Sequence, residues 1–152
     1  MLITRRLEFD AGHRIPDHRS LCRHLHGHRY AIEVTVSGDL TTQDGDARNG
    51  MVADFSELKA LVKHLIVDQW DHAFLAYKDD RVIVDFLNTL PGHRTIVFDF
   101  IPTAENLAQQ AFGILEQPVT RICNKALRLE NIRIYETPNC WADAKWSDLN
   151  KA

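Results

Sequence analysis

The chain has 152 residues and a mass of 17.4 kDa, with 45% hydrophobic and 26% charged residues. Because one domain typically has ~150 residues, this composition predicts a single domain over residues 1–152 and excludes a disordered or fibrous chain. The net charge of −3 gives no general attraction for nucleic acid or an anionic membrane, and no stretch is apolar for long enough to span a bilayer. The first residues lack the apolar core of a signal peptide, and three cysteines are too few for a disulfide scaffold. We therefore expect a cytoplasmic protein.

Two segments near the N-terminus alternate between apolar and polar residues, as a strand with one buried face does. The apolar positions are odd in the first segment and even in the second: Ile3, Leu7, Phe9 and Ala11, then Tyr30, Ile32, Val34 and Val36. Two half-buried strands so close in sequence predict an antiparallel pair.

Two later segments carry the signals of amphipathic helices with N-terminal caps. The first has Asp54 as its cap and Glu57 three residues later, as in a capping box, and an apolar stripe follows. The residues of that stripe are Phe55, Leu58, Leu61, Val62, Leu65 and Ile66. The second helix begins after Thr103 and is expected to end before Pro118. A shorter helix is expected over Arg81–Leu90.

Further strands are expected over Thr95–Ile101 and over Ala126–Glu136. The apolar parity of the last strand slips near Glu130 and Asn131, which predicts a β-bulge there. Together these elements predict an α+β domain, an antiparallel sheet with helices gathered on one face.

Histidine is the residue type with an unusual distribution. Five of the eight histidines fall within sixteen consecutive residues, with Cys22 among them: His13, His18, His24, His26 and His28. Because residues two apart on a strand share a face, His13, His26 and His28 are expected to converge on the apolar side of the strand pair. Gly27 adds no side chain that would crowd them.

Three converging imidazoles favour a metal site, although a single histidine on an apolar face is more often a core residue with a hydrogen-bond partner. Buried imidazoles without partners cost roughly a few kcal/mol each, and a metal ion removes that cost by taking ring nitrogens as ligands. Three neutral histidines suit Zn²⁺ and leave a fourth position for water or substrate, as in catalytic sites. The spacing alone leaves His24 open as a ligand, whereas His18 is expected to be exposed and without a role. The chain lacks the His-Glu-x-x-His motif of zinc peptidases.

Cys22 precedes His26 by four residues, so it is either a fourth ligand or a nucleophile or base beside the metal. Cys123 and Cys140 lack such neighbours in the sequence and are expected to be inert. The adjacent pair Asp71-His72 follows the first helix. A carboxylate beside an imidazole can orient or activate it, although a structural role is the more common interpretation of such a pair.

Six segments, taken in order, resemble the motifs of the 6-pyruvoyltetrahydropterin synthase and 6-carboxytetrahydropterin synthase family, from near residue 3 to near residue 137. They are Phe9-Asp-Ala-Gly-His13-Arg, Cys22-Arg-His-Leu-His26-Gly-His28-Arg-Tyr30, Asp54-Phe55, Asp71-His72, Pro102-Thr-Ala-Glu-Asn106 and Glu136-Thr137. The four-residue step from Cys22 to His26 resembles the bacterial 6-carboxytetrahydropterin (queuosine pathway) branch.

The resemblance implies roles for these residues. The zinc ligands would be His13, His26 and His28, without His24, and Cys22 would be the catalytic base and not a ligand. The resemblance also implies the tunnelling fold (T-fold), in which subunits join their sheets into a barrel, typically as a hexamer formed by a dimer of trimers.

Three more residues receive roles from the resemblance. Asp71 and His72 would form a second proton relay that reaches the site from a neighbouring subunit. Glu136 would hold the pterin by accepting hydrogen bonds from its ring N–H and amino groups. The triphosphate has no assigned site, and nearby arginines are candidates by proximity alone: Arg14, Arg19, Arg23 and Arg29.

The activity implied by the resemblance is zinc-dependent conversion of 7,8-dihydroneopterin triphosphate to 6-carboxy-5,6,7,8-tetrahydropterin, acetaldehyde and triphosphate, a step of queuosine (7-deazaguanine) biosynthesis. Zinc would act as a Lewis acid on the hydroxyl oxygens of the substrate side chain. Two alternatives remain: a 6-pyruvoyltetrahydropterin synthase, which keeps the carbon side chain, and a non-catalytic zinc-binding module. The expected partners are the pterin substrate and further copies of this chain, with no nucleic acid and no membrane.

Overall fold

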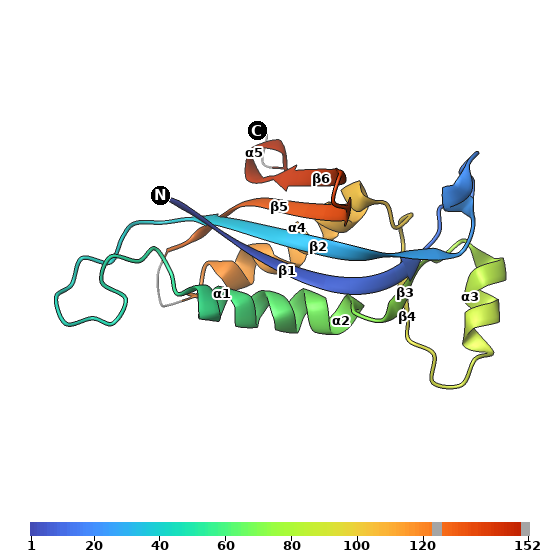
Figure 1. Ribbon diagram of the computed structural model, residues 1–152, viewed down its shortest axis with the longest axis horizontal. Helices are drawn as coiled ribbons and strands as arrows, with labels where there is room; N and C mark the ends of the chain where they lie inside the picture. Colours follow the sequence, from blue (N-terminus) through green and yellow to red (C-terminus); the bar gives the residue numbers. More distant parts are fainter. Residues whose placement is uncertain (123–125, 150–152) are drawn as a thin grey trace.

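A computed structural model describes residues 1–122 and 126–149 of the chain (Figure 1). Its six strands form one sheet in the order β4-β3-β1-β2-β5-β6. In chain order the elements are β1 (Leu2–His13), η1 (Leu21–Arg23), β2 (His26–Ser37), α1 (Phe55–Val62), η2 (Lys63–Val67), α2 (Asp68–Trp70), β3 (Ala73–Tyr77), α3 (Arg81–Asn88), β4 (Thr95–Phe98), α4 (Ala104–Val119), β5 (Arg128–Thr137), β6 (Cys140–Lys145) and α5 (Trp146–Leu149). No helix in the described residues has the length and apolar character that crossing a membrane requires.

The centre of the sheet is the predicted antiparallel pair of β1 and β2. The two strands pair over twelve residues each, from Leu2 opposite Ser37 to His13 opposite His26. Their alternating apolar residues form a buried inner face, and the outer face carries polar pairs such as the hydrogen-bonded hydroxyls of Thr4 and Thr35 at 2.8 Å. The predicted strand pair is therefore confirmed, with one apolar face and one polar face as the alternating sequence indicates.

The expectation of a wholly antiparallel sheet is wrong, because β3 runs parallel to both β1 and β4. The chain leaves β2, passes through α1 and α2, and returns in the direction of β1, a crossover that produces parallel pairing. The strand β3 was not expected, because the short segment Ala73–Tyr77 has no apolar alternation; three of its five residues are buried.

The first predicted helix begins at its expected cap, where the Asp54 carboxylate accepts a hydrogen bond from the Ser56 N–H. The helical path runs on through a short π-helical segment, η2, to Trp70. Leu58, Val62 and Ile66 are buried as expected, but Phe55 is 48% exposed. The apolar stripe therefore starts one turn later than predicted.

The other two predicted helices form with small changes. The Thr103 hydroxyl caps α4 by accepting from the Asn106 N–H at 3.3 Å, and α3 ends two residues before Leu90. Pro118, expected beyond the end of α4, lies inside its last turn. A proline there lacks the N–H donor and crowds the carbonyl four residues earlier, and burial of Val119 holds the chain in the helical path.

The last predicted strand contains the expected bulge. Thr35 of β2 pairs with Asn131 and the next residue, Val36, pairs with Leu129, so Glu130 is the extra residue on β5. The strand β6 and the short helix α5 follow, and no sequence pattern predicted either of them.

The core lies between the inner face of the sheet and the helices α1 and α4 (Figure 1). Both helices cover the same face, as predicted. Fully buried side chains from all these elements meet there, among them Ile32, Leu58, Leu107, Phe112 and Ile134.

Gly27 and Gly113 offer a matched test of this packing. Gly12 pairs with Gly27 across β1 and β2, and a Cβ added at Gly27 would lie 2.9 Å from the backbone oxygen of Ala11. Gly113 lies in α4 with no heavy atom within 4 Å of an added Cβ. We expect Gly27→Ala to lower the free energy of unfolding by roughly 1–3 kcal/mol and Gly113→Ala to raise it by up to about 1 kcal/mol. Urea unfolding of both variants measures this, and equal effects would contradict the register at Gly27.

Candidate metal centre and active site

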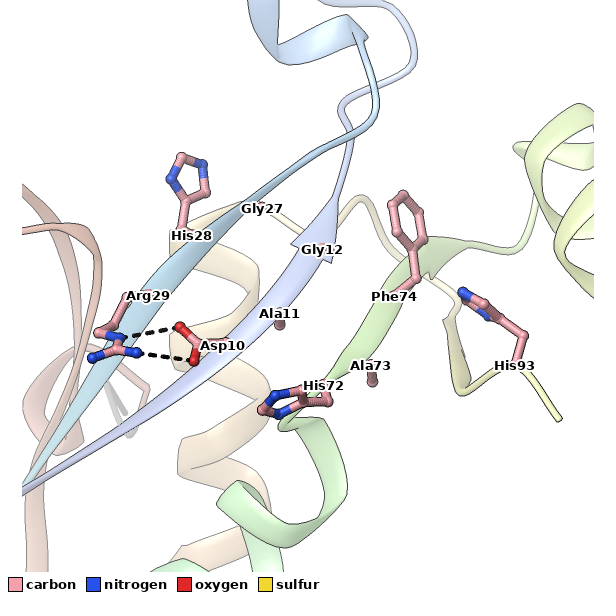
Figure 2. A pocket seen from close by; sticks show the side chains of 10 residues that line it. All are labelled: Asp10, Ala11, Gly12, Gly27, His28, Arg29, His72, Ala73, Phe74 and His93. Carbon is pink, nitrogen blue, oxygen red and sulfur yellow. Dashed lines mark hydrogen bonds and ion pairs between the residues drawn. The ribbon is translucent and has the colours of Figure 1, made fainter.

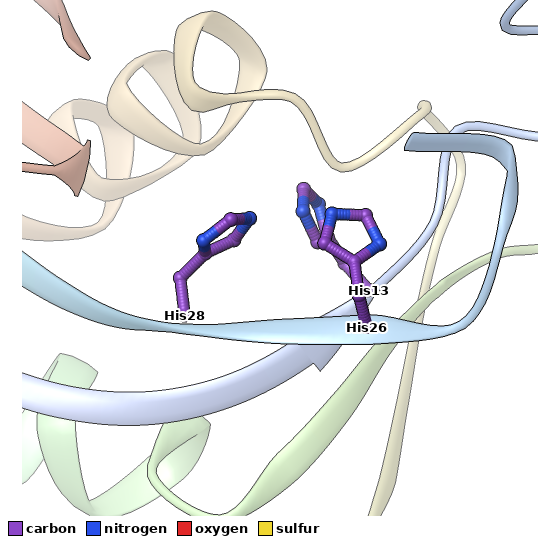
Figure 3. A group of neighbouring side chains, drawn as sticks. All are labelled: His13, His26 and His28. Carbon is purple, nitrogen blue, oxygen red and sulfur yellow. The ribbon is translucent and has the colours of Figure 1, made fainter. Parts of the chain in front are cut away.

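The structure brings His13, His26 and His28 together on the inner face, at the end of the β1–β2 pair (Figure 3). The ring centroids lie 4.6 Å apart for His13 and His26, 4.9 Å for His26 and His28, and 5.2 Å for His13 and His28. One ring nitrogen from each residue lies within 4.8 Å of the others. Strand parity, with the register that places His13 opposite His26, explains this convergence.

Backbone carbonyls fix the orientation of two of these rings. His13 Nδ1 lies 2.8 Å from the carbonyl oxygen of Pro102, and His26 Nδ1 lies 2.8 Å from that of His24. Because a carbonyl only accepts hydrogen bonds, each Nδ1 carries the hydrogen and each Nε2 keeps its lone pair. His24 thus contributes its backbone oxygen, and its ring is not part of the cluster.

The donor atoms of the cluster fit a divalent metal such as zinc. In the described part of the chain, Nε2 of His13 and Nε2 of His28 are buried and make no hydrogen bond. Leaving such atoms without partners is costly, and coordination by Nε2 with Nδ1 bonded to a carbonyl is the usual arrangement of metal-binding histidines. Burial also lowers the pKa of His13 and that of His28, which favours the neutral form that binds metal.

Glu136, at the end of β5, lies against this cluster. Its Oε1 is 3.3 Å from His13 Nε2 and 3.9 Å from His28 Nε2. The carboxylate also lines a neighbouring cavity, so it faces both the metal position and the space beside it. This end of the inner face therefore holds three imidazole donors and one acidic group.

That neighbouring cavity, which we call the Cys22 pocket, has a volume of about 340 Å³. Its lining residues are Ile15, His18, Cys22, Thr103, Ala104, Glu105, Glu136, Cys140 and Trp141. Cys22 is partly exposed at the 3₁₀ turn η1, and backbone hydrogen bonding from Ile15 N–H to the Cys22 carbonyl at 2.8 Å fixes this loop. The structure thus joins Cys22 and Glu136, which are far apart in sequence, in one cavity next to the histidines.

Sequence reasoning missed several residues of this pocket. Glu105 was assigned no role from the sequence, yet it lines the cavity. Cys140 was expected to have no reactive neighbours, yet it lines the same cavity as Cys22, whereas Cys123 lies outside the described residues. Only the Pro-Thr-Ala-Glu-Asn motif gave a signal for Glu105, because β6 and the start of α4 are brought here by tertiary packing.

Tyr30 lies directly below the histidines, with ring centroids 5.8 Å from His13 and 5.6 Å from His28. Its side chain is fully buried, and its hydroxyl makes no hydrogen bond within the described residues. Burial raises the pKa of Tyr30, so the phenol stays protonated. The side of the histidine cluster that faces the core is thus formed by an uncharged aromatic ring.

Asp71 and His72 lie on the opposite face of the sheet. The register pairs Ala11 with Ala73, which places His72 beside Asp10 on the outer, polar side. The Asp71 carboxylate accepts from the Asp10 N–H at 2.9 Å, which lowers the pKa of Asp71, and its second oxygen lies 2.9 Å from His72 Nδ1. The pair is ordered as a carboxylate–imidazole unit, but within one chain it does not reach the histidine cluster.

A second cavity, of about 550 Å³, adjoins this pair on the outer face (Figure 2). Its lining includes Gly12, Gly27, His72 and His93. The interpretation that Gly27 leaves room beside the histidines is wrong: strand alternation turns its open side to this outer cavity, and the glycine serves close backbone approach to Ala11. His72 has a φ of 56°, an uncommon conformation for a residue with a side chain, and such strain is concentrated at functional sites.

Comparison with known proteins decides the family. The family model described as 6-pyruvoyl tetrahydropterin synthase matches residues 2–146. The chain belongs to this family. A 6-carboxy-5,6,7,8-tetrahydropterin synthase from Rickettsia conorii is 34% identical over 140 residues, which are 92% of this chain and 96% of that protein. The protein of the same name from Haemophilus influenzae is 34% identical over 144 residues, covering 93% and 96%.

Solved structures confirm the T-fold of the single chain. An uncharacterized protein from Wolinella succinogenes has a TM-score of 0.76 at 22% identity, covering 96% of this chain and 98% of that one. The 6-pyruvoyl tetrahydropterin synthase of Caenorhabditis elegans has a TM-score of 0.63 at 24% identity, covering 95% and 94%. At these identities the likeness concerns the fold alone.

The lowered pKa values of His13 and His28 predict a pH dependence for the metal-free protein. In the unfolded state a histidine takes up a proton at pH about 6.5, whereas in the folded state His13 and His28 do so only at a lower pH. Protonation therefore favours the unfolded state as the pH falls through and below about 6.5. We expect the free energy of unfolding to decrease between pH 7.5 and 5.5, and less steeply in His28→Gln. Urea unfolding with chelator at several pH values measures this, and identical slopes for both proteins would contradict it.

Proposed function

We propose that this protein is a zinc-dependent 6-carboxy-5,6,7,8-tetrahydropterin synthase, which converts 7,8-dihydroneopterin triphosphate to 6-carboxy-5,6,7,8-tetrahydropterin, acetaldehyde and triphosphate. The observation that carries the proposal is the pair of buried Nε2 atoms of His13 and His28 without hydrogen bonds, beside a cavity lined by two thiols and two carboxylates. The names of the relatives at 34% identity support the reaction. Cytoplasmic location and a role in queuosine biosynthesis belong to the same proposal.

The residues of the inner face have separate roles in metal binding, proton transfer and substrate binding. His13, His26 and His28 hold the metal, which supplies Lewis acidity to the hydroxyl oxygens of the substrate side chain when bound. Cys22 borders the cavity and accepts a proton from the side-chain carbon as a thiolate. Glu136 accepts hydrogen bonds from the pterin N–H and amino groups, which orients the ring relative to Cys22.

The outer-face pair supplies the second proton relay from a neighbouring subunit. Because Asp71 and His72 lie on the face opposite to the histidine cluster, a complete site needs the pair of another chain. Asp71 holds its negative charge through the Asp10 N–H and keeps the His72 ring in place for proton transfer. The proposed assembly is a homo-oligomer, a hexamer formed by a dimer of trimers with sheets joined into a barrel.

Product analysis and metal content test the proposal together. The zinc-loaded protein should release acetaldehyde and triphosphate from 7,8-dihydroneopterin triphosphate. Cys22→Ala should keep its zinc and lose turnover by roughly 10²–10⁴-fold, the contribution of a positioned acid or base. His28→Ala should lose zinc, and the control His64→Ala, changed at an exposed position of η2, should keep both zinc and activity.

The named outcomes separate the alternatives. Triphosphate release without acetaldehyde would support a 6-pyruvoyltetrahydropterin synthase, the activity in the name of the matching family model. Zinc binding without any turnover would support a non-catalytic module. Loss of zinc from Cys22→Ala or from Glu136→Gln would make that residue a ligand and remove the role proposed for it.

Mixed oligomers test the shared site. Cys22→Ala and His72→Asn should each be inactive alone, and asparagine tolerates the left-handed backbone of His72. When the two chains are co-expressed, some sites receive Cys22 from one chain and His72 from the other, so activity should return. Measuring acetaldehyde release from the purified mixture checks this, and no recovery would place both residues in one chain's site.

A further inference from the structure

We propose that the loop between β1 and β2 forms a polyphosphate-binding subsite, in which His18, Arg19 and Arg23 bind the triphosphate of the substrate. This inference rests on the proposed function, and it names the part of the site that neither the motifs nor the comparisons assign. The shared chemistry is that of a chain of phosphate groups, whether attached to the pterin or released as product.

The first observation is a basic cavity that adjoins the Cys22 pocket. It has a volume of about 380 Å³ and is lined by Arg14, Pro16, Asp17, His18, Arg19 and Arg23. His18 lines both this cavity and the Cys22 pocket, and two adjacent residues earlier in the loop line one cavity each, Ile15 the Cys22 pocket and Pro16 the basic cavity. A ligand with its ring beside Glu136 can therefore extend past His18 into the basic cavity.

The second observation is the hydrogen bonding of His18. The Ser20 N–H donates to His18 Nδ1 at 3.1 Å, so Nδ1 is the acceptor and the neutral ring carries its hydrogen on Nε2. The His18 N–H in turn donates to the Ile15 carbonyl at 3.2 Å, which fixes the turn. A fixed Nε2–H donor at the junction of two cavities suits an anionic oxygen.

The third observation is the distribution of charge among the four arginines near the site. Arg29 pairs with Asp10 on the outer face, at 3.1 Å, and is thereby removed from the inner cavities. Arg14 is held by Asp80, a buried carboxylate at the start of α3, with Nε 2.7 Å and Nη2 3.3 Å from its oxygens. Arg19 and Arg23 are exposed and make no ion pair within residues 1–122 and 126–149.

These differences assign separate roles. Arg14 is neutralised by Asp80 and ties the start of the loop to α3, whereas Arg19 and Arg23 keep their charges and all their donors for a ligand. Asp17 is the one acidic residue in the lining and offsets only part of that charge. In a chain with a net charge of −3, this local excess of guanidinium groups suits a polyanion, because guanidinium binds phosphate oxygens in a bidentate way.

The test compares inorganic triphosphate with 7,8-dihydroneopterin, which has the pterin and side chain but no phosphate. Binding of each to the zinc-loaded protein is measured by calorimetry, with zinc content determined for every variant. The double variant Arg19→Gln/Arg23→Gln should weaken triphosphate binding by at least about tenfold and change dihydroneopterin binding by less than about twofold. In turnover assays, it should raise KM for dihydroneopterin triphosphate more than it lowers kcat.

The matched control is Arg121→Gln, the same change at an exposed arginine beyond α4 and outside both cavities, and it should leave both affinities unchanged. Raising the salt concentration should weaken triphosphate binding to the parent more than to the double variant. Equal triphosphate binding by parent and double variant would overturn the subsite, even where the parent releases acetaldehyde as the proposed function requires. A parent protein that binds triphosphate but shows no turnover, together with weaker binding by the double variant, would still support the subsite while contradicting the enzymatic proposal.

Discussion

The pairing of β1 with β2 is the constraint on which the site depends. The register that sets His13 opposite His26 also sets Gly12 opposite Gly27, so the two backbones approach closely where the histidines converge. A slip of one residue would turn His26 and His28 to the outer face and bury Gly27 and Arg29 instead. The long apolar alternation of β2 fixes the register, because the same slip would also expose its core side chains Ile32, Val34 and Val36.

The sheet divides the candidate machinery between its two faces. The donors for a metal, the thiol and the carboxylates lie on the inner face, near the helices, and the Asp71–His72 unit lies on the outer face. Each half is preorganised by backbone groups: carbonyls of Pro102 and His24 for the rings, and the Asp10 N–H for the carboxylate. Such support fixes side chains before any substrate arrives and suits catalysis that depends on position. Because the two groups lie on opposite faces of the sheet, the proposed chemistry also requires several chains to assemble.

The sequence predicted those parts of the fold that local patterns encode. Strand alternation placed His13, His26 and His28 on one face, caps located the starts of α1 and α4, and a parity slip located the bulge at Glu130. Local patterns did not predict the elements whose position depends on packing against distant parts of the chain. Nothing near Ala73 indicates a strand parallel to β1, and nothing near Cys140 indicates a strand that brings it to Cys22. The face occupied by His72 also escaped prediction, since it follows from register with a distant strand.

The paired glycines have an electrostatic consequence. Gly12 and Gly27 carry no side chain on the outer face, and the Phe74 ring covers the backbone of Gly12, so peptide backbone and one aromatic ring separate the outer cavity from the imidazoles behind it. Peptide groups screen charge far less than water does, and the interaction between two charges weakens with their separation. A charged group in the outer cavity would therefore lie behind the histidines, and its field would act on them across this wall.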